Sequence, residues 1–309
     1  MEFNKIMIET EKTIENNFLD TTPLKSVLDY ESKIGEFVSG VVVKYINENG
    51  LLVDLKNGVK GLISVNDFED MNKTSNISLI NKVGQVVFCE VTGVKDGYVV
   101  LNRCNIQKKY KKNYLNQLKP GTVFDTFVIS MAPFGAFVDI GCGIPALLPI
   151  GDIMIARFSN IKDVIKVGMP IKVIYKGYVD NGYVVSHKEL LGTWEENIKN
   201  FKSGEICQGI VREIQSYGAF IEIAPNLTGL ADYPHDFNIH VGDSVCVLFK
   251  SYNAEKLKVK LSIVRISNVA YRVNYDYYVK EGIMTDWLYT PKGSFKKIET
   301  KFNGKIEIV

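Results

Sequence analysis

Three stretches of this chain follow one pattern of glycine and apolar residues, and this repeat constrains the fold more than any other feature. The stretches begin at Gly35 (GEFVSGVVVKYINENGLLVDL), Gly121 (GTVFDTFVISMAPFGAFVDI) and Gly204 (GEICQGIVREIQSYGAFIEI). The later two have identical glycine spacing, and the first has one extra residue before Gly50. Each stretch continues with a short apolar segment and then a Val-Gly that opens another pair of strands. The pattern indicates one small structural unit that occurs three times.

Each unit contains about five short strands, separated by Gly and Asn turns such as Asn57-Gly58 and Asn181-Gly182. Closing a sheet of this size into a barrel removes its exposed edges, and the five-stranded barrel that binds oligonucleotides is the OB-fold. We therefore predict an all-β chain of three tandem five-stranded barrels joined by short helical linkers.

The repeat boundaries divide the chain into seven segments. We expect an N-terminal extension at 1–33, barrels at 34–104, 120–190 and 204–265, linkers at 105–119 and 191–203, and a Tyr-rich C-terminal extension at 266–309.

The motifs FGAFVDI and YGAFIEI, the Gly-Leu segment after them, and the Val-Gly and Leu-Ser signatures of the last two strands resemble the S1 RNA-binding domain. The resemblance covers about two thirds of the chain. With LLGTWEENIKNF between repeats and TDWLYTPKGSFKKIETKF near the end, the whole chain resembles ribosomal S1-like proteins, including short ones of Gram-positive bacteria. The resemblance implies binding of single-stranded RNA and a connection with the small ribosomal subunit and translation.

Strand alternation in the second repeat predicts which side chains face outward. Ala136, Val138 and Ile140 form one apolar row, so Phe137 shares the opposite row with Asp139. An aromatic beside an acid indicates a solvated face. A bulge or tight bend at Gly135 would bring Phe134 to the same outer face.

The third repeat has the same arrangement, with Phe220 beside Glu222 and Tyr217 before Gly218. Exposed aromatic pairs suit single-stranded nucleic acid, because a base stacks on an aromatic ring for about 1 to 3 kcal/mol. The alternative is that these rings only cover the end of a barrel. The resemblance also implies a histidine contact, but Ser64, Pro149 and Asp232 stand at that position.

The first repeat has Asn49 and Leu52 where the others have aromatic residues. Its row of Leu51, Val53 and Leu55 still supports a barrel. We expect a folded repeat without base stacking. By resemblance to ribosomal protein S1, we expect residues 1 to about 104 to engage the ribosome or another protein.

Basic residues supply candidate phosphate contacts. Lys256, Lys258 and Lys260 alternate along the last strand of the third repeat, either as phosphate ligands or as ordinary solvated lysines. The resemblance implies a basic residue near Lys258 on the RNA face. Further candidates are His187 and Lys188, which follow the last strand of the second repeat, and Arg212, on the first strand of the third.

The segments between and after the barrels contain recurring apolar and aromatic residues. Ile106, Tyr110, Tyr114 and Leu118 predict a helix whose lysines either solvate a spacer or form a further phosphate patch. Trp194 is expected to pack between the second and third barrels. The tyrosines of the C-terminal extension either cap the third barrel or form another stacking surface.

Composition excludes several classes of protein. Hydrophobic residues make up 46% and charged residues 23%, as in soluble globular proteins. The net charge of +2 means that RNA affinity depends on local patches. No apolar run approaches the roughly 20 residues of a membrane helix, and the first residues do not resemble a signal peptide. We expect a cytoplasmic protein that does not bind a membrane.

No motif in the sequence indicates catalysis, a metal site or a cofactor. The five cysteines are scattered without CxxC spacing, and the three histidines lack ligand spacing, so we expect no disulfide framework, metal or cofactor. No phosphate-binding glycine loop, nucleophile elbow or carboxylate cluster is present. We expect a protein that is not an enzyme and takes no small-molecule substrate. We expect it to hold single-stranded RNA, above all messenger RNA, on the second and third barrels. The alternatives are a ribosome-independent regulator of RNA decay or transcription and a protein-interaction scaffold.

Overall fold

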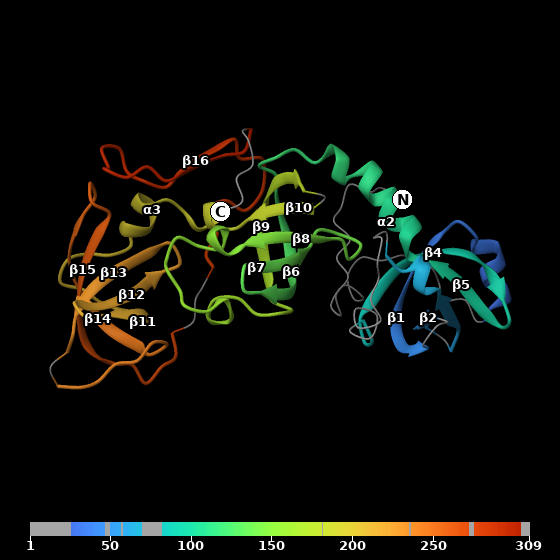
Figure 1. Cartoon of the computed structure of the whole chain (residues 1–309), viewed down its shortest axis with the longest axis horizontal. Coiled ribbons are helices and arrows are strands. Elements are labelled where there is room, and N and C mark those ends of the chain that lie inside the picture. The colour runs from blue at the N-terminus through green and yellow to red at the C-terminus, as the bar shows by residue number, and fades with distance from the viewer. Residues whose placement is uncertain are drawn as a thin grey trace. The chain divides into compact units, whose positions relative to one another are not determined.

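The computed structural model describes residues 26–46, 50–56, 58–69, 82–180, 182–234, 236–271 and 275–303. Within them the chain forms three closed five-stranded barrels (Figure 1). The predicted all-β architecture of tandem OB-fold barrels is confirmed. Asn49, both turn asparagines named above, and most of the N-terminal extension lie outside the described residues.

The first barrel contains β1 (Phe37–Ile46), β2 (Gly50–Asp54), β3 (Lys60–Ile63), β4 (Val86–Lys95) and β5 (Tyr98–Asn102). Strand β1 pairs antiparallel with both β2 and β4, and β3 pairs parallel with β5 to close the barrel. Leu51 and Val53 are fully buried and Leu55 is 4% exposed, as the alternating pattern predicts. A 3-10 helix, Leu28–Lys33, precedes the barrel.

The second and third barrels repeat this topology. The second contains β6 (Val123–Ala132), β7 (Gly135–Asp139), β8 (Pro145–Pro149), β9 (Pro170–Val179) and β10 (Gly182–Ser186). The third contains β11 (Ile206–Gln215), β12 (Gly218–Ala224), β13 (Leu227–Asp232), β14 (Ser244–Asn253) and β15 (Lys258–Ile266). The predicted inward rows of both barrels are buried. They are Ala136, Val138 and Ile140 in the second barrel and Ala219, Ile221 and Ile223 in the third.

Both linkers contain a helix. Helix α2 (Arg103–Asn113) begins at Asn102, whose side chain accepts a hydrogen bond from the backbone N of Asn105, and its Tyr110 is fully buried. Helix α3 (Trp194–Ile198) begins with a capping box formed by Thr193 and Glu196. Trp194 is 2% exposed and belongs to the hydrophobic core of the third barrel.

The C-terminal extension contacts the second and third barrels, rather than the third alone (Figure 1). The backbone N of Met284 donates to the carbonyl of Gly121 at the start of the second barrel. Trp287 and Tyr289 then join the core of the third barrel. Strands β16 (Asp286–Leu288) and β17 (Glu299–Lys301) pair to form a small hairpin. Because these two rings are buried, they pack in the core of the third barrel and are not available to stack with bases.

The described residues divide into two compact units. The first comprises those up to 118 together with 139–145, and the second comprises the others. The first unit includes the segment 139–145 because α2 holds it: the Tyr110 hydroxyl donates to the carbonyl of Ile140, and Gln107 Nε2 donates to that of Cys142. The second unit contains most of the second barrel, the third barrel, α3 and the C-terminal extension.

Two further features concern the described residues alone. None of their helices has the length and apolar character needed to cross a membrane. Their His, Cys, Asp and Glu side chains form no group of three that could hold a metal ion.

Candidate nucleic-acid interface

A glycine occupies the same position in all three barrels because a carbonyl oxygen fills the space of a side chain. Gly50, Gly135 and Gly218 begin β2, β7 and β12, each with positive φ. A Cβ there would lie 2.0, 2.3 and 2.5 Å from the carbonyl oxygens of Ile63, Leu148 and Ala231, respectively. Any larger residue would push the next strand away.

The aromatic pair of the second barrel forms around this glycine. Phe134 lies in the turn before β7 with 58% of its surface exposed, and Phe137 is partly exposed. Their ring centroids are 6.1 Å apart with an interplanar angle of 88°. The prediction that Phe134 joins Phe137 is confirmed. The bulge, however, lies on the partner strand, between Val128 and Ser130 of β6.

The third barrel repeats the pair. Tyr217 is 62% exposed, and its ring lies 6.2 Å from that of Phe220 at 87°. Here too the bulge lies on the preceding strand, between Val211 and Glu213. Two barrels of different sequence therefore present the same edge-to-face pair at the same position.

Strand register places a lysine beside the aromatic pair of the third barrel. Phe220 pairs with Leu230 on β13, which pairs with Lys260 on β15. Two strand spacings, about 10 Å, separate the aromatic from the lysine backbone. Lys258 lies two residues earlier on the same face of β15, and Lys256 lies in the turn before the strand. All three side chains are exposed.

The same register in the other barrels gives different chemistry. In the first barrel Leu52 pairs with Leu62, and Leu62 pairs with Val100. In the second barrel Leu147 pairs with Val184, which is 2% exposed. The combination of aromatic pair and lysine row therefore belongs to the third barrel.

The acids beside the two central aromatics are not solvated, and our expectation of a wet face at that level was wrong. Asp139 and Glu222 are both fully buried. Asp139 accepts a hydrogen bond from the backbone N of Gly141 at 2.8 Å. Strand alternation distinguishes inner from outer positions, but other segments of the chain cover part of the outer face.

Arg212 lies inside this covered region rather than on the surface. It is 2% exposed, and its Nε donates to Glu222 Oε2 at 2.6 Å. The main-chain register shifts at this residue, and its carbonyl accepts from the Ser159 hydroxyl of the second barrel. Burial raises the pKa of Glu222, while the guanidinium opposes that rise. The expected surface phosphate contact at Arg212 is not available in this arrangement.

His187 is likewise buried, between tyrosines of the C-terminal extension. Its Nδ1 lies 2.7 Å from the carbonyl oxygen of Ile153, and its Nε2 lies 3.2 Å from the hydroxyl of Tyr277. The rings of Tyr275 and Tyr277 meet the imidazole edge to face. Burial lowers the pKa of His187 to about 4, so the imidazole is neutral at neutral pH.

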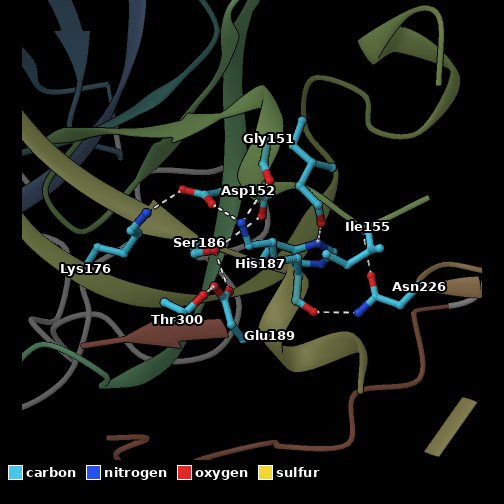
Figure 2. Close-up of polar contacts among 11 residues, drawn as sticks. Gly151, Asp152, Ile155, Lys176, Ser186, His187, Glu189, Asn226 and Thr300 are labelled. Carbon is cyan, nitrogen blue, oxygen red and sulfur yellow. Dashed lines mark hydrogen bonds and ion pairs between the residues drawn. The ribbon is translucent and has the colours of Figure 1, made fainter. Parts of the chain in front are cut away.

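A polar network around Asp152 and Glu189 lies at the end of the second barrel (Figure 2). Lys188 belongs to this network. Its Nζ donates to Asp152 Oδ1 at 2.6 Å, and Lys176 donates to the other carboxylate oxygen at 2.8 Å. Glu189 accepts hydrogen bonds from the hydroxyls of Ser186 and Thr300, and burial raises its pKa. This network joins β10 to β17 and leaves Lys188 engaged within the fold.

Asn226 is a structural residue that the sequence did not reveal. It lies in the turn between β12 and β13, and its Oδ1 accepts from the backbone N of Ile155 at 3.0 Å. Its Nδ2 donates to the carbonyls of Lys188 and Gly192. In the sequence, Pro225-Asn226 indicates only a turn. The hydrogen-bond partners of the Asn226 side chain are about 35 and 70 residues away, so no local pattern reveals them.

Comparison with protein families gives a match that includes the aromatic pair of the second barrel. Residues 117–186 match the model of the S1 RNA binding domain. The matched residues run from just before β6 to the end of β10, so the match covers the second barrel. The third barrel shares its topology, its glycine and its aromatic pair.

Similarity to known proteins extends beyond the matched S1 domain. The chain is 31% identical to a small ribosomal subunit protein bS1 homolog from Bacillus subtilis, over 65% of this chain and 53% of that protein. It is 30% identical to the homolog from Bacillus cereus, over 75% of this chain and 62% of that protein. The chain thus spans about half to three fifths of the length of these curated relatives.

A solved structure is also similar in part. It is a multidomain protein with nucleic acid binding domains from Streptococcus pneumoniae, 12% identical, with a TM-score of 0.25 over 76% of this chain and 75% of that one.

Proposed function

We propose that this chain binds single-stranded RNA on its second and third barrels, through Phe134 and Phe137 in one and Tyr217 and Phe220 in the other. The observation that carries the proposal is the repetition of one edge-to-face pair at one position in two barrels. In the first barrel, Leu52 occupies the position of the central aromatic. The first barrel therefore closes without an aromatic ring at this position. This supports a role in binding, rather than in folding, for Phe137 and Phe220.

The proposed interface supplies both contributions to single-strand binding, base stacking and phosphate contacts. Each exposed ring offers a stacking platform worth about 1 to 3 kcal/mol per base. Lys256, Lys258 and Lys260 provide phosphate contacts beside the pair of the third barrel. Stacking tolerates any base, so the proposal predicts weak preference for sequence and clear preference for an unpaired strand.

Titration of the chain with a fluorescent single-stranded RNA, and with the same sequence in a duplex, tests this function. We expect the single strand to bind more tightly, and its affinity to fall with salt. Equal binding of both forms, or no binding of the single strand, would contradict the proposal.

We propose further that the RNA is messenger RNA and that the chain acts with the small ribosomal subunit in translation, as a binding protein rather than an enzyme. The support is similarity to proteins named as components of that subunit. The first barrel, without aromatics at the stacking position, is the candidate for protein docking.

Cosedimentation with ribosomes at moderate and high salt tests the association. We expect the chain in the ribosomal fraction at moderate salt, and a chain lacking residues 1–104 to be depleted from it. Full association without that segment would contradict docking by the first barrel. RNA binding without any cosedimentation would instead indicate a regulator that works apart from ribosomes.

A further inference from the structure

The loop 290–297 of the C-terminal extension lies beside the lysine row of the third barrel. It contains the most exposed large hydrophobic side chain among the described residues, Phe295, at 74%. It also carries the exposed Lys292 and Lys296. We propose that this loop is a second stacking and phosphate-contacting site for single-stranded RNA, continuing the path that begins at Tyr217 and Phe220. This inference rests on the proposed function.

The loop is held to the barrel at its tip. The backbone N of Phe295 donates to the carbonyl of Glu255 at 3.0 Å, and the Ser294 hydroxyl donates to the same oxygen at 3.1 Å. Glu255 lies in the turn between β14 and β15, next to Lys256. The loop therefore meets the barrel where the lysine row begins.

The loop is also closed at its base. The backbone N of Tyr289 donates to the carbonyl of Ile298, and Tyr289 is 4% exposed in the core of the third barrel. The backbone N of Ser294 donates to the carbonyl of Pro291 across a turn in which Gly293 has φ of +90°. A glycine at this third position is what a type II turn requires.

This double attachment distinguishes Phe295 from an ordinary exposed apolar residue. A single exposed hydrophobic side chain needs no special explanation. Here, however, hydrogen bonds fix the backbone on which the ring stands, so binding a base there costs little ordering of the loop.

Charge on the loop suits phosphate. No ion pair is formed by Lys292, Lys296 or Lys256 within the part of the chain that the structure describes. Lys297 differs, because its Nζ lies 2.8 Å from Glu299 Oε2. The loop that carries Lys292 and Lys296 meets the barrel at Glu255, directly before the lysine row. The proposed RNA path therefore runs from Phe220 past Lys260 to Phe295.

The test is fluorescence anisotropy of the full chain with a single-stranded oligo-uridine of about 12 nucleotides, within the site sizes of OB-folds. We expect Phe295→Ala to weaken binding by about 5- to 150-fold, the equivalent of one stacked base. We expect Lys292→Gln with Lys296→Gln to lower the magnitude of the salt slope by about 1.4, since each phosphate contact on a single strand contributes about 0.7.

Two control variants match these changes elsewhere in the same unit. Leu288→Ala removes an exposed apolar side chain from β16, and Lys199→Gln with Lys202→Gln removes two exposed lysines near α3. Both are expected to keep wild-type affinity. Because the Phe295 ring is exposed, we expect its removal to leave thermal unfolding unchanged.

The results separate this inference from the proposed function. If Phe220→Ala weakens RNA binding while Phe295→Ala and the lysine variant do not, the loop is not a binding site and the function stands. If the wild-type chain does not bind the oligonucleotide, the proposed function itself is contradicted.

Discussion

At the scale of single residues, the pairing of Phe134 with Phe137 depends on a neighbour without a side chain. Gly135 allows the strand to approach the carbonyl of Leu148, and Gly218 does the same at Ala231. Gly50 keeps this geometry in the first barrel, whose strand continues with Leu52. The glycine is therefore needed for the barrel, while the rings are free to serve binding.

His187 illustrates how burial sets the charge of a residue. Its pKa is about 4 in the folded chain and 6.5 in an ordinary environment. Between these values the unfolded chain binds a proton that the folded chain does not bind. Folding stability from this residue is therefore intact above about pH 6.5 and is lost as pH falls toward 4, by about 3 kcal/mol in all.

We predict that the stability difference between the wild-type chain and His187→Gln shrinks by about 3 kcal/mol from pH 6.5 to pH 4. Chemical denaturation over this range measures the difference directly, and other titrating groups cancel between the two proteins. A difference that stays constant with pH would show that the imidazole is already solvated in the folded chain.

At the scale of elements, the turn between β12 and β13 joins the third barrel to the end of the second. Asn226 satisfies three backbone groups there, from Ile155, Lys188 and Gly192. Strand β17 contributes Thr300 to the adjacent network around Glu189. These bonds couple the two barrels that carry the aromatic pairs.

We predict that Asn226→Ala destabilises this unit by at least about 1 to 3 kcal/mol, because it leaves buried backbone groups without partners. Urea denaturation measures the loss. Asn200→Ala, which removes an exposed side chain that donates to the Tyr278 hydroxyl, is the matched control. Equal stability of both variants would contradict a coupling role for Asn226.

Strand alternation predicts the inward rows, the three glycines and the aromatic pairs, because these features depend on neighbours within one repeat. Strand alternation fails for the two acids, which are buried. The basic candidates His187, Lys188 and Arg212 are buried or engaged within the fold as well. The three basic candidates contact distant segments: Tyr277 is 90 residues from His187, Asp152 is 36 residues from Lys188, and Asp163 is 49 residues from Arg212. An outward position on an isolated barrel becomes buried when a second barrel or the C-terminal extension covers it.

At the scale of the whole molecule, a net charge of +2 cannot provide a general attraction for RNA. The phosphate contribution must come from local groups, and Lys256, Lys258 and Lys260 are the exposed row beside an aromatic pair. Affinity and its salt dependence should therefore respond to different residues.

We predict that neutralising these three lysines lowers the magnitude of the salt slope by up to about 2, with a similar loss of affinity for every RNA sequence. Binding titrations at several salt concentrations measure the slope. Replacing the exposed Lys44, Lys56 and Lys95 of the first barrel is the matched control. If both triple variants behave alike, the row consists of ordinary solvated lysines.

The most direct test of the account is the affinity of single-stranded RNA for the full chain carrying Phe137→Ala and Phe220→Ala together. Stacking on both barrels predicts a loss of about 2 to 5 kcal/mol in binding free energy while the fold survives. Leu52→Ala, at the equivalent position of the first barrel, should bind RNA as the wild type does. Unchanged affinity in the double variant would contradict the aromatic interface.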